Sequence, residues 1–347
     1  MHTAGGAPAR ATVAVFGLGG TISMKAPTGT SAAVPALHAG ELLAGVPGLD
    51  EIDADLRVVD VRAGAGVSLG FADIHALAGS IAEALGAGAS GAVVTQGTDT
   101  IEETAYLLDL LHTGPQPVVV TGAMRNPSLA GADGPANLLA AVQTAASSRT
   151  RGLGTLVVFA DEIHAAARVR KSHTTSIGTF ESPDSGPLGH VVEGEPRLLS
   201  RPAARLGIPD VPTRDRRVGL ATISLDDHGE LLAGAQGLDG LVVAGMGVGH
   251  VPPNLVEALA GLAGQLPVVL ASRTGAGSTL ENAYGFPGSE RDLLGRGLIP
   301  AGFLHPLKAR ILLHTVLCAD ADRPTIATAF AVAGGRSDPA AWPWPTA

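Results

Sequence analysis

The sequence predicts a two-domain α/β protein, with a larger doubly wound parallel-sheet N-terminal domain and a smaller α/β C-terminal domain. The chain has 347 residues, more than the roughly 100–200 of a typical single domain. Short apolar runs rich in β-branched residues alternate with longer segments of helical period. A stretch from about Leu199 to Arg216, rich in proline and charge, has neither period. We therefore expect domains at residues 1–199 and 217–347, joined by a linker at 200–216.

The apolar runs are typical of buried parallel strands, because they are short, continuous and bounded by residues that favour turns. The expected strands are Ala11–Phe16, Gly91–Thr95, Pro117–Thr121, Thr155–Ala160, Arg217–Ile223, Leu241–Met246 and Val268–Ser272. The expected helices are Phe71–Leu85, Ile101–Leu111, Ala136–Ala146, Asn254–Leu266 and Leu307–Leu317. This alternation predicts a mostly parallel sheet with helices on both faces and a ligand site at the carboxyl ends of its strands.

The composition excludes several classes of protein. Hydrophobic residues make up 46% of the chain and charged residues 16%, which excludes disorder and predicts a large dry core. The net charge of −9, without a long basic run, argues against binding to nucleic acid or anionic membranes. The single cysteine, Cys318, excludes an intramolecular disulfide and is expected in the core. With neither a signal-peptide pattern nor a long apolar run, the expected location is the cytoplasm.

The first candidate motif is the GLGGTIS segment at residues 17–23. A dinucleotide-binding fingerprint needs a third glycine that opens a helix, but Ile22 occupies that position and a loop follows. The glycine pair instead allows a sharp turn that presents the Thr21 hydroxyl at the sheet edge, as a nucleophile requires. The alternative is an ordinary turn in which Thr21 bonds only to the backbone.

The second motif is the TQGTDTIEETA segment at residues 95–105. Thr100 and Glu103 have the spacing of a capping box, so they need no catalytic explanation. Thr98 and Asp99 lie between the strand end and this cap, where free N–H groups favour an oxyanion or a bound carboxylate. Alternatively, Asp99 only stabilises the helix dipole.

The third motif is the RVRK run at residues 168–171. Such runs are usually solvated, but a lysine placed among buried polar groups loses its proton readily and acts as a base towards a hydroxyl. The eleven histidines show no metal-ligand spacing, although Glu162 and His164 lie two residues apart. The sequence therefore predicts neither a metal site nor a cofactor.

These segments together resemble the bacterial-type L-asparaginases, threonine amidohydrolases that convert asparagine to aspartate and ammonia. The similarity continues through GAMRNPSLAGADGPANLLAAV and RKSHTTSIGTFESPDSGPLG to SRTGAG and HPLKARILL, and so covers nearly the whole chain. The amino-acid sequences of these segments most resemble those of the actinobacterial branch of the family. The resemblance implies a homotetramer built as a dimer of dimers, with L-asparagine as substrate and with no cofactor.

The resemblance also implies a role for individual residues. Thr21 is then the nucleophile, and Thr98, Asp99 and Lys171 form a hydroxyl, carboxylate and amine group that activates the reaction. The implied substrate-binding residues are Gly20, Ser68, Gly97, Asp99 and Ala123. Of these, Asp99 binds the α-ammonium group and Ala123 offers its carbonyl to the leaving nitrogen.

Some positions depart from the family pattern. The expected lid, Lys25–Pro35, lacks the usual tyrosine, and the chain has only Tyr106 and Tyr284. Ser68 lies two residues from the usual place of a carboxylate ligand, and Val248 stands where an asparagine is expected. Glu281 is the candidate for the glutamate that the family contributes from the partner subunit. These departures leave open a glutaminase-asparaginase, a related amidase and a binding protein without turnover as alternatives.

Overall fold

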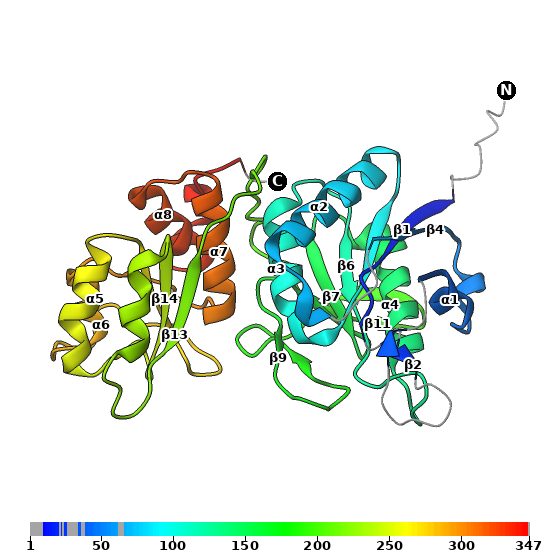
Figure 1. Ribbon diagram of the computed structural model, residues 1–347. Helices are drawn as coiled ribbons and strands as arrows, with labels where there is room; N and C mark the ends of the chain where they lie inside the picture. The colour runs from blue at the N-terminus through cyan, green and yellow to red at the C-terminus, as the bar shows by residue number, and fades with distance from the viewer. Residues whose placement is uncertain are drawn as a thin grey trace.

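The structure is a computed structural model that describes residues 10–20, 22, 24–25, 34–35, 39–61 and 66–345. Two sheets lie side by side, and each has helices packed against it (Figure 1). The described residues therefore form a mixed α/β fold with a large, mostly parallel sheet and a separate, smaller parallel sheet, as the sequence predicted.

The larger sheet has the strand order β12-β11-β8-β7-β6-β5-β1-β4. Its parallel part runs from β7 to β4 and is extended by three strands in antiparallel pairing, which the sequence analysis did not predict. The strands are β1 (Ala11–Gly17), β4 (Ala54–Asp60), β5 (Gly91–Thr95), β6 (Val118–Thr121), β7 (Thr155–Phe159), β8 (Glu162–Ala165), β11 (Gly189–Val192) and β12 (Glu195–Leu198). Two short hairpins pair β2 (Met24–Lys25) with β3 (Val34–Pro35), and β9 (Arg170–Lys171) with β10 (Phe180–Glu181).

Successive side chains of a strand point to opposite faces of the sheet, and on β1 both sets of side chains are buried. Ala14 and Phe16 of β1 belong to the cluster that includes α2 (Phe71–Gly86) and α3 (Ile101–Leu111). Val13 and Val15 belong to the opposite cluster, which includes residues of α1 (Ala39–Ala44) and α4 (Gly134–Ala146). The sheet is therefore covered by helices on both sides.

The smaller sheet has the parallel order β13-β14-β15-β16. Its strands are β13 (Val218–Thr222), β14 (Gly240–Gly245), β15 (Val268–Ser272) and β16 (Ile299–Pro300). The helices α5 (Val256–Ala263) and α6 (Glu290–Gly295) contribute to one apolar cluster, and α7 (Pro306–Cys318) and α8 (Arg323–Ala333) to another. This second cluster also contains α2 and α3, so one apolar core joins the two sheets.

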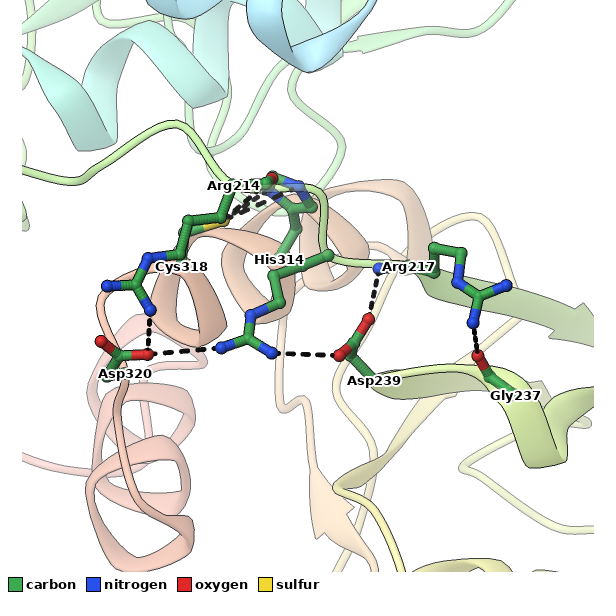
Figure 2. A network of polar contacts seen from close by, with 8 residues as sticks. Arg214, Arg217, Gly237, Asp239, His314, Cys318 and Asp320 are labelled. Atoms are coloured by element: carbon green, nitrogen blue, oxygen red, sulfur yellow. Dashed lines mark hydrogen bonds and ion pairs between the residues drawn. The ribbon is translucent and has the colours of Figure 1, made fainter.

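The segment between β12 and β13 contains neither helix nor strand, and ion pairs hold it to residues next to the ends of α7 and β14 (Figure 2). The guanidinium groups of Arg214 and Arg216 both contact Asp320, and Arg216 also contacts Asp239 at 3.1 Å. The second oxygen of Asp239 accepts the backbone N–H of Arg217 at 2.7 Å. This backbone hydrogen bond, with the contribution of Arg216, holds the pKa of Asp239 below its usual value.

Among the helices of the described residues, none combines the length and the apolar character needed to cross a membrane. Cys318 lies fully buried on α7. Two expected strands, Gly91–Thr95 and Val268–Ser272, and the expected helix Ile101–Leu111 have the bounds that the sequence predicts. The region expected as helix Asn254–Leu266 is instead a 3₁₀ turn followed by the shorter α5.

Candidate active site

The carboxyl ends of three neighbouring parallel strands bring the predicted motifs to one edge of the larger sheet. Gly17 at the end of β1 pairs with Thr95 at the end of β5, which in turn pairs with Thr121 at the end of β6. The segments that follow these strands therefore emerge side by side. This is the edge at which open parallel sheets bind their ligands.

The backbones of Gly20 and Gly97 lie in direct contact at this edge. Gly20 has a φ of +94°, and a Cβ atom added there would lie 2.1 Å from the Gly97 backbone nitrogen. Both the conformation and the space therefore exclude a side chain at position 20. Thr21 itself lies outside the described residues. Its neighbour Ile22 is buried and packs against Gly134.

The hairpin of β9 and β10 carries Lys171 to the residues that follow β5. The Lys171 Nζ atom donates hydrogen bonds to Thr98 Oγ1 at 2.9 Å and to Asp99 Oδ1 at 2.8 Å. The Lys171 side chain is 16% exposed and that of Asp99 is 62% exposed, whereas Thr98 is buried. One amine thus joins a sheltered hydroxyl to a solvent-facing carboxylate, and Lys171 does not lie on a solvated face.

The predicted capping box is wrong. Thr100 precedes α3, but its side chain makes no capping hydrogen bond and its hydroxyl oxygen instead accepts from Gln96 Nε2 at 3.3 Å. The physical reason is that a 3₁₀ turn, Thr98–Thr100, runs directly into α3, so Thr100 lacks the extended backbone of a capping residue. Burial raises the pKa of Glu103, the other residue of the predicted capping box, and the neighbouring Glu102 carboxylate raises this pKa further.

Glu102 contacts the backbone of the β9–β10 hairpin. The sequence analysis did not predict this role. Its side chain is buried, and its Oε1 atom accepts the backbone N–H of Lys171 at 3.2 Å. The signal in the sequence was an acidic residue on the face of a helix that is otherwise apolar. Glu103, the next residue in the motif, is only partly buried. The spacing alone therefore did not show which of the two glutamates contacts the hairpin.

Ala123 follows β6 in a loop that two further missed residues hold in place. The carboxylate of Asp133 accepts backbone N–H groups from the two residues after Ala123, at 3.0 and 2.9 Å. Asn137 donates to the Gly122 carbonyl at 3.0 Å and to Asp133 at 3.1 Å. The ADGPAN segment therefore positions the Ala123 loop, although the sequence analysis gave its polar residues no role.

The remaining predicted positions lie in different surroundings. Ser68 is exposed in a 3₁₀ turn, Gly66–Ser68, that lies against the turn Thr98–Thr100. Glu281 forms an ion pair with Arg336 of its own chain at 2.9 Å. Most of the expected lid, residues 26–33, lies outside the described residues.

The tyrosines and candidate metal ligands can be placed in the same way. Tyr106 is buried on α3, whereas Tyr284 is 47% exposed. His164 contacts Ser182 at 3.0 Å and Glu162 at 3.2 Å. Across the part of the chain that the structure describes, no group of three or more His, Cys, Asp or Glu residues is arranged to hold a metal ion.

Comparisons with protein families give two matches along the chain. Residues 12–204 match the model "Asparaginase, N-terminal", and residues 217–330 match "Glutaminase/Asparaginase C-terminal domain". A "Probable L-asparaginase" of Deinococcus radiodurans is 42% identical over 253 residues, which cover 72% of this chain and 77% of that protein. "L-asparaginase 2" of Escherichia coli K12 is 37% identical over 250 residues, covering 69% and 70%.

Two further similarities extend over more of the chain. A "Glutaminase-asparaginase" of Pseudomonas fluorescens biotype A is 34% identical over 334 residues, covering 92% of this chain and 90% of that protein. The crystal structure of a probable cytoplasmic L-asparaginase from Campylobacter jejuni superimposes with a TM-score of 0.83 at 32% identity, covering 92% of this chain and 99% of that one. With both family models matched in order on the fold and site described above, this chain belongs to the asparaginase family.

Proposed function

We propose that this protein is an L-asparagine amidohydrolase, which converts asparagine and water to aspartate and ammonia. The observation that carries the proposal is the contact of Lys171 with both Thr98 and Asp99, at the sheet edge where Gly20 meets Gly97. The asparaginase relatives support it. The assignment of the chain to the actinobacterial branch stays a prediction.

The proposed reaction proceeds through an ester of Thr21. The Thr21 hydroxyl oxygen attacks the side-chain amide carbon of asparagine, and its proton passes to the leaving nitrogen, which departs as ammonia. Water then attacks the β-aspartyl ester, and Thr21 recovers its proton as aspartate forms. The Thr98 backbone N–H faces the developing oxyanion, and Ala123 offers its carbonyl to the leaving nitrogen.

The group of Lys171, Thr98 and Asp99 is proposed to move and hold protons during these steps. The buried Thr98 hydroxyl connects the amine to the reacting atoms, and the exposed Asp99 carboxylate is free on one side to bind the substrate α-ammonium group. Gly20, Gly97 and Ser68 complete the proposed substrate site. The tight backbone contact of the two glycines is suited to a small substrate held against the sheet edge.

A glutaminase-asparaginase is the second candidate, because a relative with that name matches 92% of this chain. Glutamine is longer than asparagine by one methylene group, which usually changes selectivity only about 10- to 200-fold. Measurement of kcat/KM for both free amino acids decides between the candidates. A preference for glutamine contradicts the narrower proposal.

We further propose a cytoplasmic homotetramer built as a dimer of dimers. Support comes from exposed apolar side chains near the second sheet, among them Leu280, Tyr284 and Phe286 at 38–47% exposure. The name of the Campylobacter jejuni protein supports the cytoplasmic location. Light scattering after gel filtration tests the assembly, and a monomer at micromolar concentration contradicts it.

The function itself is tested by ammonia release from L-asparagine, with the wild-type protein beside Thr21→Ala. We expect turnover by the wild type and its loss, by several orders of magnitude, in the variant. Binding of asparagine by calorimetry without ammonia release supports the binding protein instead. Full activity of Thr21→Ala refutes the assignment of the nucleophile.

A further inference from the structure

Lys308 lies on α7, which packs with the smaller sheet, but its side chain is buried against residues that belong to the larger sheet's part of the chain. It lies in the first turns of α7, and its residue is 1% exposed. Its Nζ atom donates to the backbone carbonyl of Ala166 at 2.7 Å and to that of Glu102 at 3.0 Å. The ring of Tyr106 lies below the same atom, 5.5 Å from Nζ to the centroid. All three of these contacts are made with residues that precede β13 in the chain, so the N-terminal part of the chain holds the ammonium group.

The two carbonyls belong to the two segments that carry the proposed catalytic group. Glu102 lies one turn after Thr98 in the first turn of α3, and Ala166 lies shortly before Lys171 on the way to β9. The carboxylate of Glu102 also accepts the backbone N–H of Lys171. Lys308 thus connects the helix that positions the hydroxyl with the strand that positions the amine.

We infer that Lys308 is a positioning residue. From its place on α7, it sets the distance between Lys171 and Thr98. The inference rests on the proposed function. Without the ammonium group, the Glu102 and Ala166 carbonyls lose a shared donor, so α3 and the β9 segment are joined by fewer hydrogen bonds and can move apart. The hydrogen bond between Lys171 and Thr98 lengthens as they do.

Burial favours the neutral form of Lys308 but does not remove its role. Desolvation lowers the pKa of Lys308 to about 8, while the neighbouring Glu102 acts in the opposite direction. A neutral amine retains two N–H donors, which is enough for the two carbonyls. The contacts therefore persist on both sides of that pH.

A matched control is available at the other end of α3, the helix whose first turn Lys308 contacts. Arg205 is 8% exposed and donates to the carbonyls of His112 and Gly114, directly after α3 ends. At a rise of 1.5 Å per residue, this end is about 16 Å from the first turn of α3. Lys308→Met and Arg205→Met each remove a buried cation that holds two carbonyls, but only the first is next to the proposed catalytic group.

The test compares kcat, KM and Tm of the two variants with those of the wild type. We expect Tm to fall in both. For Lys308→Met we expect kcat to fall about 10- to 100-fold with KM changed less than about threefold, because a displacement on the order of 1 Å costs about that much. For Arg205→Met we expect kcat within about threefold of the wild type.

Hydrogen exchange gives a second readout that is independent of turnover. We expect peptides covering residues 98–104 and 166–172 to exchange faster in Lys308→Met and to remain protected in Arg205→Met. If the wild type releases no ammonia from either amino acid, the proposed function fails, while the exchange pattern still tests the positioning.

Two results overturn the inference. One is wild-type kcat in folded Lys308→Met, with a loss of Tm like that of the control. The other is equal protection of both peptides in the two variants. If Lys308→Met does not fold, Lys308→Leu, which also removes the donor but has a shorter side chain, replaces it, and wild-type kcat in that variant overturns the inference equally.

Discussion

Replacement of Lys171 by methionine separates catalysis from stability at the candidate site. The change keeps a long side chain but removes the donor to both Thr98 and Asp99. Because Asp99 is mostly exposed, the ion pair is worth only about 0.2–1 kcal/mol to folding. The hydrogen bond to the Thr98 hydroxyl adds about 1 kcal/mol. The total loss of unfolding free energy is therefore about 1–2 kcal/mol.

The expected loss of activity is much larger than this loss of stability. A positioned proton-transfer group contributes about 10²–10⁴-fold to rate, so kcat/KM of Lys171→Met is expected to fall by that factor. The assay is steady-state ammonia release from asparagine, with Tm and circular dichroism measured on the same preparation. The cooperative unfolding transition is expected to remain.

The control removes a surface ion pair far along the sheet. Arg197 on β12 contacts Glu193, and both side chains are more than half exposed. Arg197→Met is therefore expected to leave kcat/KM unchanged. The reasoning is refuted if Lys171→Met retains kcat/KM within about threefold of the wild type, or if the control loses as much activity.

Three further changes test the surroundings of the site. Gly20→Ala places a Cβ atom 2.1 Å from the Gly97 nitrogen, so a fall in Tm and a loss of activity of at least about tenfold are expected by calorimetry and ammonia assay. Asp133→Asn leaves backbone donors beside Ala123 poorly paired, and denaturant titration is expected to show about 1–3 kcal/mol lower stability. Hydrogen bonds lower the pKa of Asp239, so its carboxylate stabilises the fold above pH 3.8 and this contribution is lost as the pH falls through the lowered pKa. Asp239→Asn is therefore expected to narrow the difference in Tm between pH 6 and pH 3, and an unchanged difference contradicts the assignment.

The parallel part of the fold could be predicted because its strands and helices have strong local patterns. The run Gly91–Thr95 is buried on both faces, and its uninterrupted apolar sequence shows this directly. The antiparallel strands β8, β11 and β12 are partly exposed and contain polar or charged residues, so neither an apolar run nor a clear alternation marks them. Their pairing depends on the neighbouring strands and not on local sequence.

The candidate site could be predicted only in part for a similar reason. Thr98 and Asp99 directly follow a recognisable strand, so their position at the sheet edge can be derived from the sequence. The contact of Thr98 with Lys171 spans 73 residues, and no local pattern encodes it. The role of Lys308 depends on how α7 packs against α3, and a single lysine in a helix gives no sign of its burial.

The central claim is that Thr21 carries the acyl group, and mass spectrometry of the enzyme during turnover tests it most directly. The reaction with asparagine is stopped by acid within milliseconds to seconds, digested, and searched for the mass of one aspartyl group. The account predicts this adduct on the peptide that contains Thr21, and its absence from Thr21→Ala. An adduct on the peptide that contains Thr98, or turnover by Thr21→Ala at the wild-type rate, contradicts the account.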